Sequence, residues 1–190
     1  MINQQTEQGR EKVNSEYILL LDADIELQPG TISTLLDQLV NQELDMVSLM
    51  AFLRMQSFWE ILLMPAFIYF FKLLYPFALA NSASKWVAAA AGGCILIKTN
   101  RLNEIGGFAA LKNELIDDCA LARHIKRAGG RTWLGLSHSA ISHRCYDTLQ
   151  TIWGMVARTA YTQLHFSVAL LLLCTLLMVL AFVLPVISIF

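Results

Sequence analysis

Two aspartates, Asp22 and Asp24, stand one residue apart directly after the apolar run from Tyr17 to Leu21. Side chains at positions i and i+2 of an extended segment point the same way, so both carboxylates can face one divalent cation, or a phosphate-bearing ligand through it. The structural alternative is that one aspartate caps the next helix while the other is solvated. The pattern allows a metal site at Asp24 and Asp22, but by itself it favours the structural alternative.

The apolar run before these aspartates predicts the strand that positions them. Tyr17 to Leu21 shows no polar/apolar alternation, which is typical of a strand buried on both faces in a parallel sheet covered by helices. Ligands bind beyond the carboxyl ends of the strands in such sheets. Thr31 to Leu39 then has apolar residues at helical spacing after Pro29. We therefore expect an α/β fold in the order strand, acidic loop, helix.

A glycine pair and a second acidic pair follow further along the chain. Gly92 and Gly93 precede a predicted strand and let a ligand approach the backbone, although they also suit a plain turn. Asp117 and Asp118 begin a predicted helix that ends before Gly129. The helix dipole favours carboxylates at that end, which by itself can explain both.

The composition points to a membrane. Hydrophobic residues make up 56% of the 190 residues and charged residues 15%, against roughly 45–50% and a quarter in ordinary globular chains. The net charge of −1 and the lack of a basic run exclude a general attraction for nucleic acid. Four scattered cysteines without a Cys-x-x-Cys pair predict reduced thiols.

Three segments carry the membrane prediction. Residues 58–80 are aromatic and apolar but interrupted by charges and prolines, which favours helices at the membrane interface, with a buried core helix as the alternative. Residues 148–164 predict an amphipathic membrane-proximal helix. Residues 165–190 hold an uncharged run long enough to cross a bilayer as a transmembrane helix. Because the nearby positive charges precede this run, the positive-inside rule places residues 1–164 in the cytoplasm.

The motifs taken together resemble a known family. The stretches that carry the likeness are Leu63 to Phe67, Tyr69 to Phe71, Leu74 to Phe77, Ala88 to Cys94, Leu115 to Ala122, Trp133 to Leu136 and Met155 to Leu164. In their order the chain resembles the family 2 glycosyltransferases of the GT-A fold, and more closely the hopanoid-biosynthesis-associated membrane glycosyltransferases. The resemblance implies an incomplete GT-A sheet in residues 1–147, attached to the inner membrane of a bacterium with its catalytic part on the cytoplasmic side.

The resemblance also implies roles for the candidate residues. Asp24 would be the direct ligand of a divalent metal, Mn²⁺ or Mg²⁺, and Asp22 would hold the nucleotide side or an outer-shell water. By match to Glu-Asp-x-x-Leu, Asp118 would be the catalytic base of an inverting transfer, and Asp117 stands where the family has Glu. Arg158 falls at the Arg of the family's last motif and would contact the diphosphate.

The implied partners are a nucleotide-diphospho-sugar donor, a lipid acceptor such as a hopanoid and the membrane itself, with no nucleic acid. Gly92 and Gly93 would lie beside the bound substrate. The family's strand-helix units that bind the nucleotide base have no room before Tyr17, so the resemblance predicts an N-terminally truncated chain.

Two other functions remain open. A haloacid-dehalogenase-like phosphatase also carries Asp-x-Asp at a strand end, with the first Asp as nucleophile, but it wants Thr or Val where this chain has Glu26. A non-catalytic membrane-attached fragment is favoured by the missing nucleotide half and opposed by the two intact acidic pairs.

Overall fold

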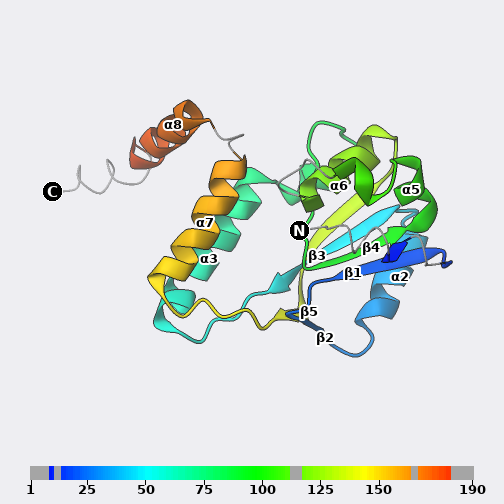
Figure 1. Cartoon of the computed structure of the whole chain (residues 1–190), viewed down its shortest axis with the longest axis horizontal. Coiled ribbons are helices and arrows are strands. Elements are labelled where there is room, and N and C mark those ends of the chain that lie inside the picture. The colour runs from blue at the N-terminus through cyan, green and yellow to red at the C-terminus, as the bar shows by residue number, and fades with distance from the viewer. Residues whose placement is uncertain (1–8, 11–13, 112–116, 164–166, 181–190) are drawn as a thin grey trace. The chain divides into compact units, whose positions relative to one another are not determined.

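A computed structural model of the chain describes residues 9–10, 14–111, 117–163 and 167–180. Strands and helices are mixed along the chain (Figure 1). In chain order the elements are β1 (Tyr17–Leu21), β2 (Ile25–Leu27), α2 (Thr31–Asn41), β3 (Met46–Phe52), α3 (Phe58–Leu74), α4 (Phe77–Ala80), β4 (Cys94–Lys98), α5 (Thr99–Glu104), the 3₁₀ helix η1 (Phe108–Leu111), α6 (Asp117–Arg127), β5 (Thr132–Ser142), α7 (Leu149–Gln163) and α8 (Val168–Met178). They form two compact units, residues 1–147 and 148–190.

The first unit is built on a mixed sheet. Its five described strands lie in the order β1-β4-β3-β5-β2. Only β3 and β5 pair in parallel, while β1 with β4, β3 with β4 and β2 with β5 are antiparallel. The expected α/β class is confirmed, but the expectation of a parallel sheet is wrong for most of the pairs.

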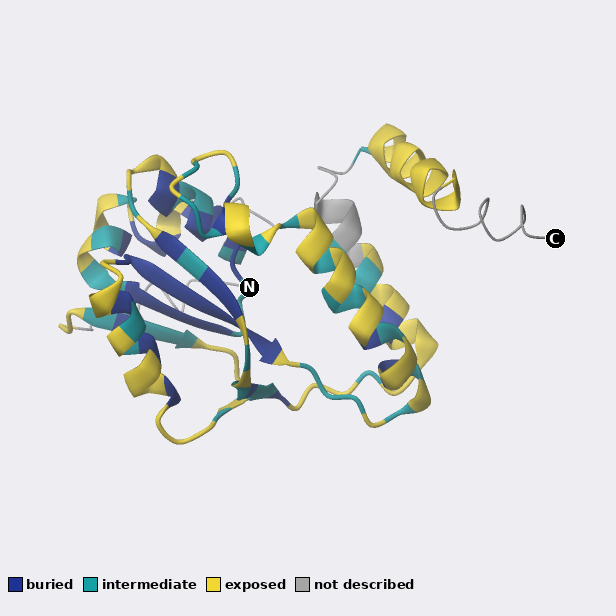
Figure 2. Ribbon diagram, turned by 180° about the vertical axis from the view of Figure 1, so that it is seen from behind, coloured by how far each residue is buried: buried dark blue, intermediate teal, exposed yellow. Residues whose placement is uncertain are grey.

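The prediction for β1 itself needs correction. Tyr17–Leu21 lies at one edge of the described sheet, and Leu21 keeps 43% of its surface exposed. The strands with continuous burial are instead β3 and β4, which lie inside the sheet and appear dark blue in Figure 2. An unbroken apolar run does not by itself distinguish an edge strand from a central one, because the pattern reports apolar faces and not the neighbour at each edge.

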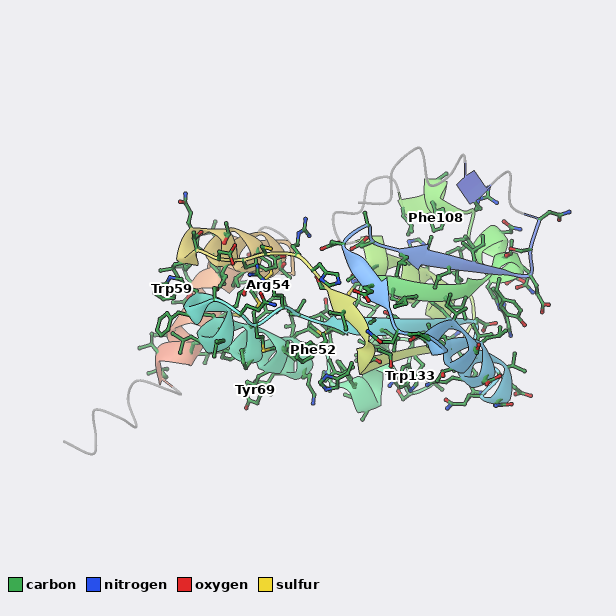
Figure 3. The ribbon with its side chains drawn as sticks, turned by 90° about the horizontal axis from the view of Figure 1, so that it is seen from below. Phe52, Arg54, Trp59, Tyr69, Phe108 and Trp133 are labelled. Atoms are coloured by element: carbon green, nitrogen blue, oxygen red, sulfur yellow. The ribbon has the colours of Figure 1, made fainter. Side chains whose placement is uncertain are left out.

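Helices cover the two faces of the sheet with separate apolar clusters. Helix α2 packs Leu35 and Leu39 against one face, in a cluster that Trp133 joins. Helices α5 and α6 cover the other face, where Leu121 and Phe108 share a second cluster. Phe108 and Trp133 accordingly lie on opposite sides of the sheet in Figure 3. The sheet is therefore packed on both faces, and this packing holds the ends of its strands in place.

The aromatic segment 58–80 forms two helices. Helix α3 runs through Pro65 to Leu74, and α4 follows after Pro76. Helix α3 begins with a capping box in which the Ser57 side chain accepts from the Glu60 N–H and the Glu60 carboxylate accepts from the Ser57 N–H. These pairings satisfy backbone donors that a helix start otherwise leaves open.

Glu60 also joins α3 to the segment after β5. Its side chain has no exposed surface, and its carboxylate accepts from the N–H groups of Gln56 at 3.0 Å, Ser57 at 2.9 Å and Tyr146 at 2.8 Å. Burial alone raises the pKa of Glu60, but these three N–H groups and the Arg54 guanidinium overcome it and lower the pKa to about 2. Arg54 lies on the segment that leads from β3 to α3 (Figure 3).

The second unit contains α7 and α8. Within the described residues no helix is both long enough and apolar enough to span a bilayer. The transmembrane helix expected over 165–190 falls partly on residues 165–166 and 181–190, outside the described residues; its described part contains α8.

We predict that E60Q destabilises the chain and makes its free energy of unfolding depend less on pH between pH 2 and pH 5. The NH₂ group of the introduced Gln cannot accept hydrogen bonds from the backbone N–H groups that Glu60 satisfies. The free energy of unfolding at pH 7 should therefore fall by about 2 kcal/mol or more. Because the pKa of Glu60 is lowered from 4.5 to about 2, its contribution is complete above about pH 5 and is lost as the pH falls toward 2.

Unfolding followed by circular dichroism between pH 2 and pH 7 tests this prediction. D37N, which changes an exposed carboxylate on α2, is the matched control and should behave like the parent chain. An E60Q chain as stable as D37N at pH 7 would show that the buried carboxylate does not hold α3 in place.

Candidate functional site

The glycine pair lies directly beside Asp22. In the β1–β4 ladder Leu21 pairs with Cys94, and the next bond along runs from the Asp22 N–H to the Gly93 carbonyl oxygen at 3.1 Å. The antiparallel pairing thus continues one residue beyond each strand. It places Asp22, at the carboxyl end of β1, against the residues that lead into β4.

Asp118 approaches the same glycine pair from α6. A Cβ atom built on Gly92 would lie 3.3 Å from Oδ2 of Asp118. The other oxygen, Oδ1, accepts from the Cys119 N–H at 2.8 Å, which fixes the carboxylate at the start of the helix. Asp22 therefore adjoins the glycine pair through its backbone N–H, and Asp118 adjoins it through its carboxylate.

The segment before the glycines is held by contacts with β3 and α6. Ser48 Oγ of β3 donates to the Ala91 carbonyl at 2.9 Å and accepts from the Ala91 N–H at 2.8 Å. The Cys119 thiol donates to the Ala90 carbonyl at 3.4 Å, and burial raises the pKa of Cys119 to about 12. Both contacts are structural, and they set the approach of α6 to the glycine pair.

His143 and Arg144 follow β5 and lie close to Asp24 and Glu26. The Asp24 carbonyl accepts from the His143 N–H at 2.8 Å, which brings the two strand ends together. Arg144 Nε lies 3.9 Å from Asp24 Oδ2, and His143 Nε2 lies 2.6 Å from Glu26 Oε2. Two acidic side chains at alternate positions, Asp24 and Glu26, thus contact Arg144 and His143.

The charge of Asp24 affects the pKa of Asp22. Burial raises the pKa of Asp22, the charge of Asp24 raises it further, and Arg144 works in the opposite direction. A cation between the two carboxylates would relieve this repulsion. Carboxylate oxygens are also the ligands that Mg²⁺ and Mn²⁺ prefer.

The donor set therefore fits a divalent metal bound partly by other groups. Among the residues that the structure describes, no group of three or more His, Cys, Asp or Glu side chains is placed to hold a metal ion. Two carboxylates completed by water and phosphate oxygens are a common arrangement for Mg²⁺. Asp22 and Asp24 suit that arrangement.

The remaining predicted residues are placed only by their backbone. Asp117 is the first residue of α6, and Arg158 lies in α7 within the second unit. Their side chains lie outside the described part of the structure. Their expected contacts with substrate remain predictions.

Sequence reasoning missed Glu26, His143 and Arg144. It assigned Glu26 to a loop, whereas Glu26 lies in the short strand β2, paired with Ile141 of β5. It gave neither His143 nor Arg144 a role in a site. The available signal was the polar stretch just after β5, since strand ends near an acidic motif are the expected place for binding residues.

The chain was compared with models of known protein families. Residues 2–189 match the model described as glycosyl transferase family 21. The comparison with curated proteins finds no match.

We predict that substitutions around Asp22 shift its pKa in opposite directions. D24N removes a neighbouring negative charge and should lower the pKa of Asp22, whereas R144Q removes a positive charge and should raise it. Carbon-13 NMR titration of labelled aspartate carboxyl groups measures both shifts. D37N should leave the pKa unchanged, and an equally unchanged pKa in D24N would mean that the two carboxylates do not share a site.

Proposed function

The chain belongs to glycosyl transferase family 21, and on that premise we propose that it transfers a sugar from a nucleotide-diphosphate donor to a lipid acceptor at a membrane surface. The single observation that supports the proposed site most strongly is the convergence on the glycine pair. Asp22 bonds to the backbone of Gly93, and the carboxylate of Asp118 faces Gly92. The proposed donor-binding residue and the proposed base therefore both adjoin the glycine pair.

The donor side of the proposed site consists of Asp22, Asp24 and Arg144. Departure of a nucleoside diphosphate concentrates negative charge on its phosphates, and a divalent cation held by the two aspartates would neutralise that charge without proton transfer. Arg144 lies 3.9 Å from Asp24. Its guanidinium can turn from that carboxylate to a phosphate oxygen, for which its fork of N–H donors is well suited.

The acceptor side of the proposed site is Asp118. An acceptor hydroxyl beside Gly92 would pass its proton to the Asp118 carboxylate as its oxygen bonds to the sugar carbon. The bond from that carbon to the diphosphate breaks in the same step, so the configuration of the sugar inverts. Gly92 keeps the backbone clear beside Oδ2, where a Cβ would stand 3.3 Å from it.

The finer features of the proposal come from the sequence. We assign the sheet to the GT-A type, Asp117 to the substrate side beside the base, and Arg158 to the diphosphate. The acceptor is a hopanoid-like lipid and the location is the inner membrane of a bacterium, with residues 1–147 on its cytoplasmic side. The exposed aromatic and aliphatic side chains of α3 support contact with lipid.

We predict that D118N lowers sugar transfer by a factor of roughly 10² to 10⁴, the range in which a general base contributes. Binding of Mn²⁺ and a nucleoside diphosphate should remain as in the parent chain, because Asp118 does not hold the donor in this account. Transfer is measured with a panel of nucleotide-diphosphate sugars and lipid acceptors, with D37N as control.

Normal turnover by D118N would refute the assignment of the base. A parent chain that uses none of these donors and shows no metal-linked binding of nucleoside diphosphate would instead support a non-catalytic membrane-attached fragment.

We predict that R144Q raises the KM for the donor by roughly tenfold or more, because a hydrogen bond to a charged phosphate is worth about 1.5–3 kcal/mol. The effect on kcat should be smaller. R127Q, at an exposed cation on α6, is the matched control. A KM for R144Q equal to that of R127Q would remove Arg144 from the donor site.

A further inference from the structure

The loop between α4 and β4 is held in a fixed shape by a buried lysine. Lys126 of α6 is 3% exposed, and its Nζ donates to the carbonyls of Ser82 at 3.0 Å, Ser84 at 3.1 Å and Val87 at 2.7 Å. Three bonds from one ammonium group satisfy all of its donors. They also fix three carbonyls of one short loop around a single atom, so the loop has little freedom to rearrange.

A second anchor holds the start of this loop. The side chain of Asn81 donates to the Leu134 carbonyl at 2.9 Å and accepts from the Leu134 N–H at 2.7 Å. It pairs with β5 in the way that a neighbouring strand would. The loop is thus tied to α6 and to the sheet at once.

This rigid loop presents an indole to the outside. Trp86 is 97% exposed, although its backbone N–H donates to Ser84 Oγ at 3.3 Å and its neighbour Val87 is partly buried. Full exposure of so large an apolar group in a fixed loop favours a surface that binds something. The indole combines an apolar ring with one N–H donor, and such side chains settle at the interface between lipid and water.

The segment around Trp86 carries other exposed apolar side chains. Val87 packs in the same cluster as Phe71, Tyr75 and Phe77, so the loop lies beside the end of α3 and the start of α4. Lys72 Nζ lies 5.9 Å from the centre of the Phe77 ring, which ties the same two helices together. The exposed apolar side chains of this region are Leu73, Leu74, Leu79 and Trp86.

The exposed charged side chains of residues 57–87 are all positive. Between residues 57 and 87 the sequence has one acid, Glu60, and two bases, Lys72 and Lys85. Glu60 has no exposed surface, whereas both lysines are exposed. The exposed charges of residues 57–87 are therefore positive, which complements a bilayer that contains anionic lipids.

We infer that Lys72, Leu73, Leu74, Leu79, Lys85 and Trp86 form a docking surface for an anionic lipid bilayer, named here the Trp86 surface. Trp86 and the leucines enter the interface, and the two lysines contact the headgroups. The inference rests on the membrane part of the proposed function, and extends it to a rigid loop and to the charge of the lipid. Because α6 carries both Asp118 and Lys126, docking of this loop also fixes the base relative to the lipid surface.

A local probe in the full chain tests the Trp86 surface independently of any other membrane attachment. An environment-sensitive fluorophore is attached to A83C, at an exposed position of the loop, after Cys145 and Cys174 are changed to Ser. The same label on S33C, at an exposed position of α2, is the matched control. Emission is compared in buffer, in phosphatidylcholine vesicles and in vesicles with added phosphatidylglycerol.

We expect the label at A83C to shift to shorter wavelength with the anionic vesicles and much less with the zwitterionic ones, while the label at S33C stays unchanged. K72E/K85E should weaken docking of the loop about thirtyfold or more, since each lysine near an anionic surface contributes about a factor of five. R127E/R131E, with the same change in net charge on exposed residues of another region, should retain the shift. W86S should reduce it.

Three results would overturn the inference. One is no shift at A83C with anionic vesicles, and another is an equal shift with both kinds of vesicle or at both label positions. The third is a shift in buffer alone that grows with protein concentration, which would assign the surface to a second copy of the chain. Loss of sugar transfer with the vesicle response intact would count against the proposed function and leave the Trp86 surface standing.

Discussion

The antiparallel pairing of β1 with β4 is the constraint on which the proposed site depends. The hydrogen bond from Asp22 to Gly93 extends this pairing past the last residue of β1. The position of Asp22 relative to the glycine pair therefore depends on the register of β1 and β4. A slip of one residue would move every β1 side chain to the other face and Asp22 away from the glycine pair. The burial of β4, the partner strand of β1, also holds this register, because a shifted β4 would expose its apolar side chains.

Two buried charges, Glu60 and Lys126, fix the segments around this pairing. Both are satisfied mainly by backbone groups: Glu60 by three N–H groups and Lys126 by three carbonyls. A buried charge without partners is very costly, so each side chain strongly favours one local backbone arrangement. One arrangement begins α3, and the other shapes the loop that carries Trp86. The helices and loop that we assign to the lipid surface are thereby joined rigidly to the sheet that carries the acidic residues.

The sequence predicted the parts of this structure that local patterns control. The strand before Asp22, the helix after Pro29 and the helix that begins at the second acidic pair all follow from apolar spacing and end signals. It did not predict that β1 is at an edge of the described sheet, or that β2 exists, because strand pairing over long distances leaves no local mark. Glu26 and His143 illustrate the limit: 117 positions separate them, yet their side chains meet at 2.6 Å. The family match supports the class of enzyme inferred from the motifs, while the roles of single residues rest on geometry.

Paramagnetic broadening by Mn²⁺ tests most directly whether a metal at Asp22 and Asp24 lies close to Asp118. The full chain, labelled with nitrogen-15, is titrated with Mn²⁺ in the presence of a nucleoside diphosphate. The account predicts early loss of the amide signals of Gly92, Gly93 and Cys119, retention of those of α2 around Ser33, and no such loss in D24N. Strong Gly92 and Cys119 signals at a Mn²⁺ level that removes those of Asp22 and Asp24 would contradict it.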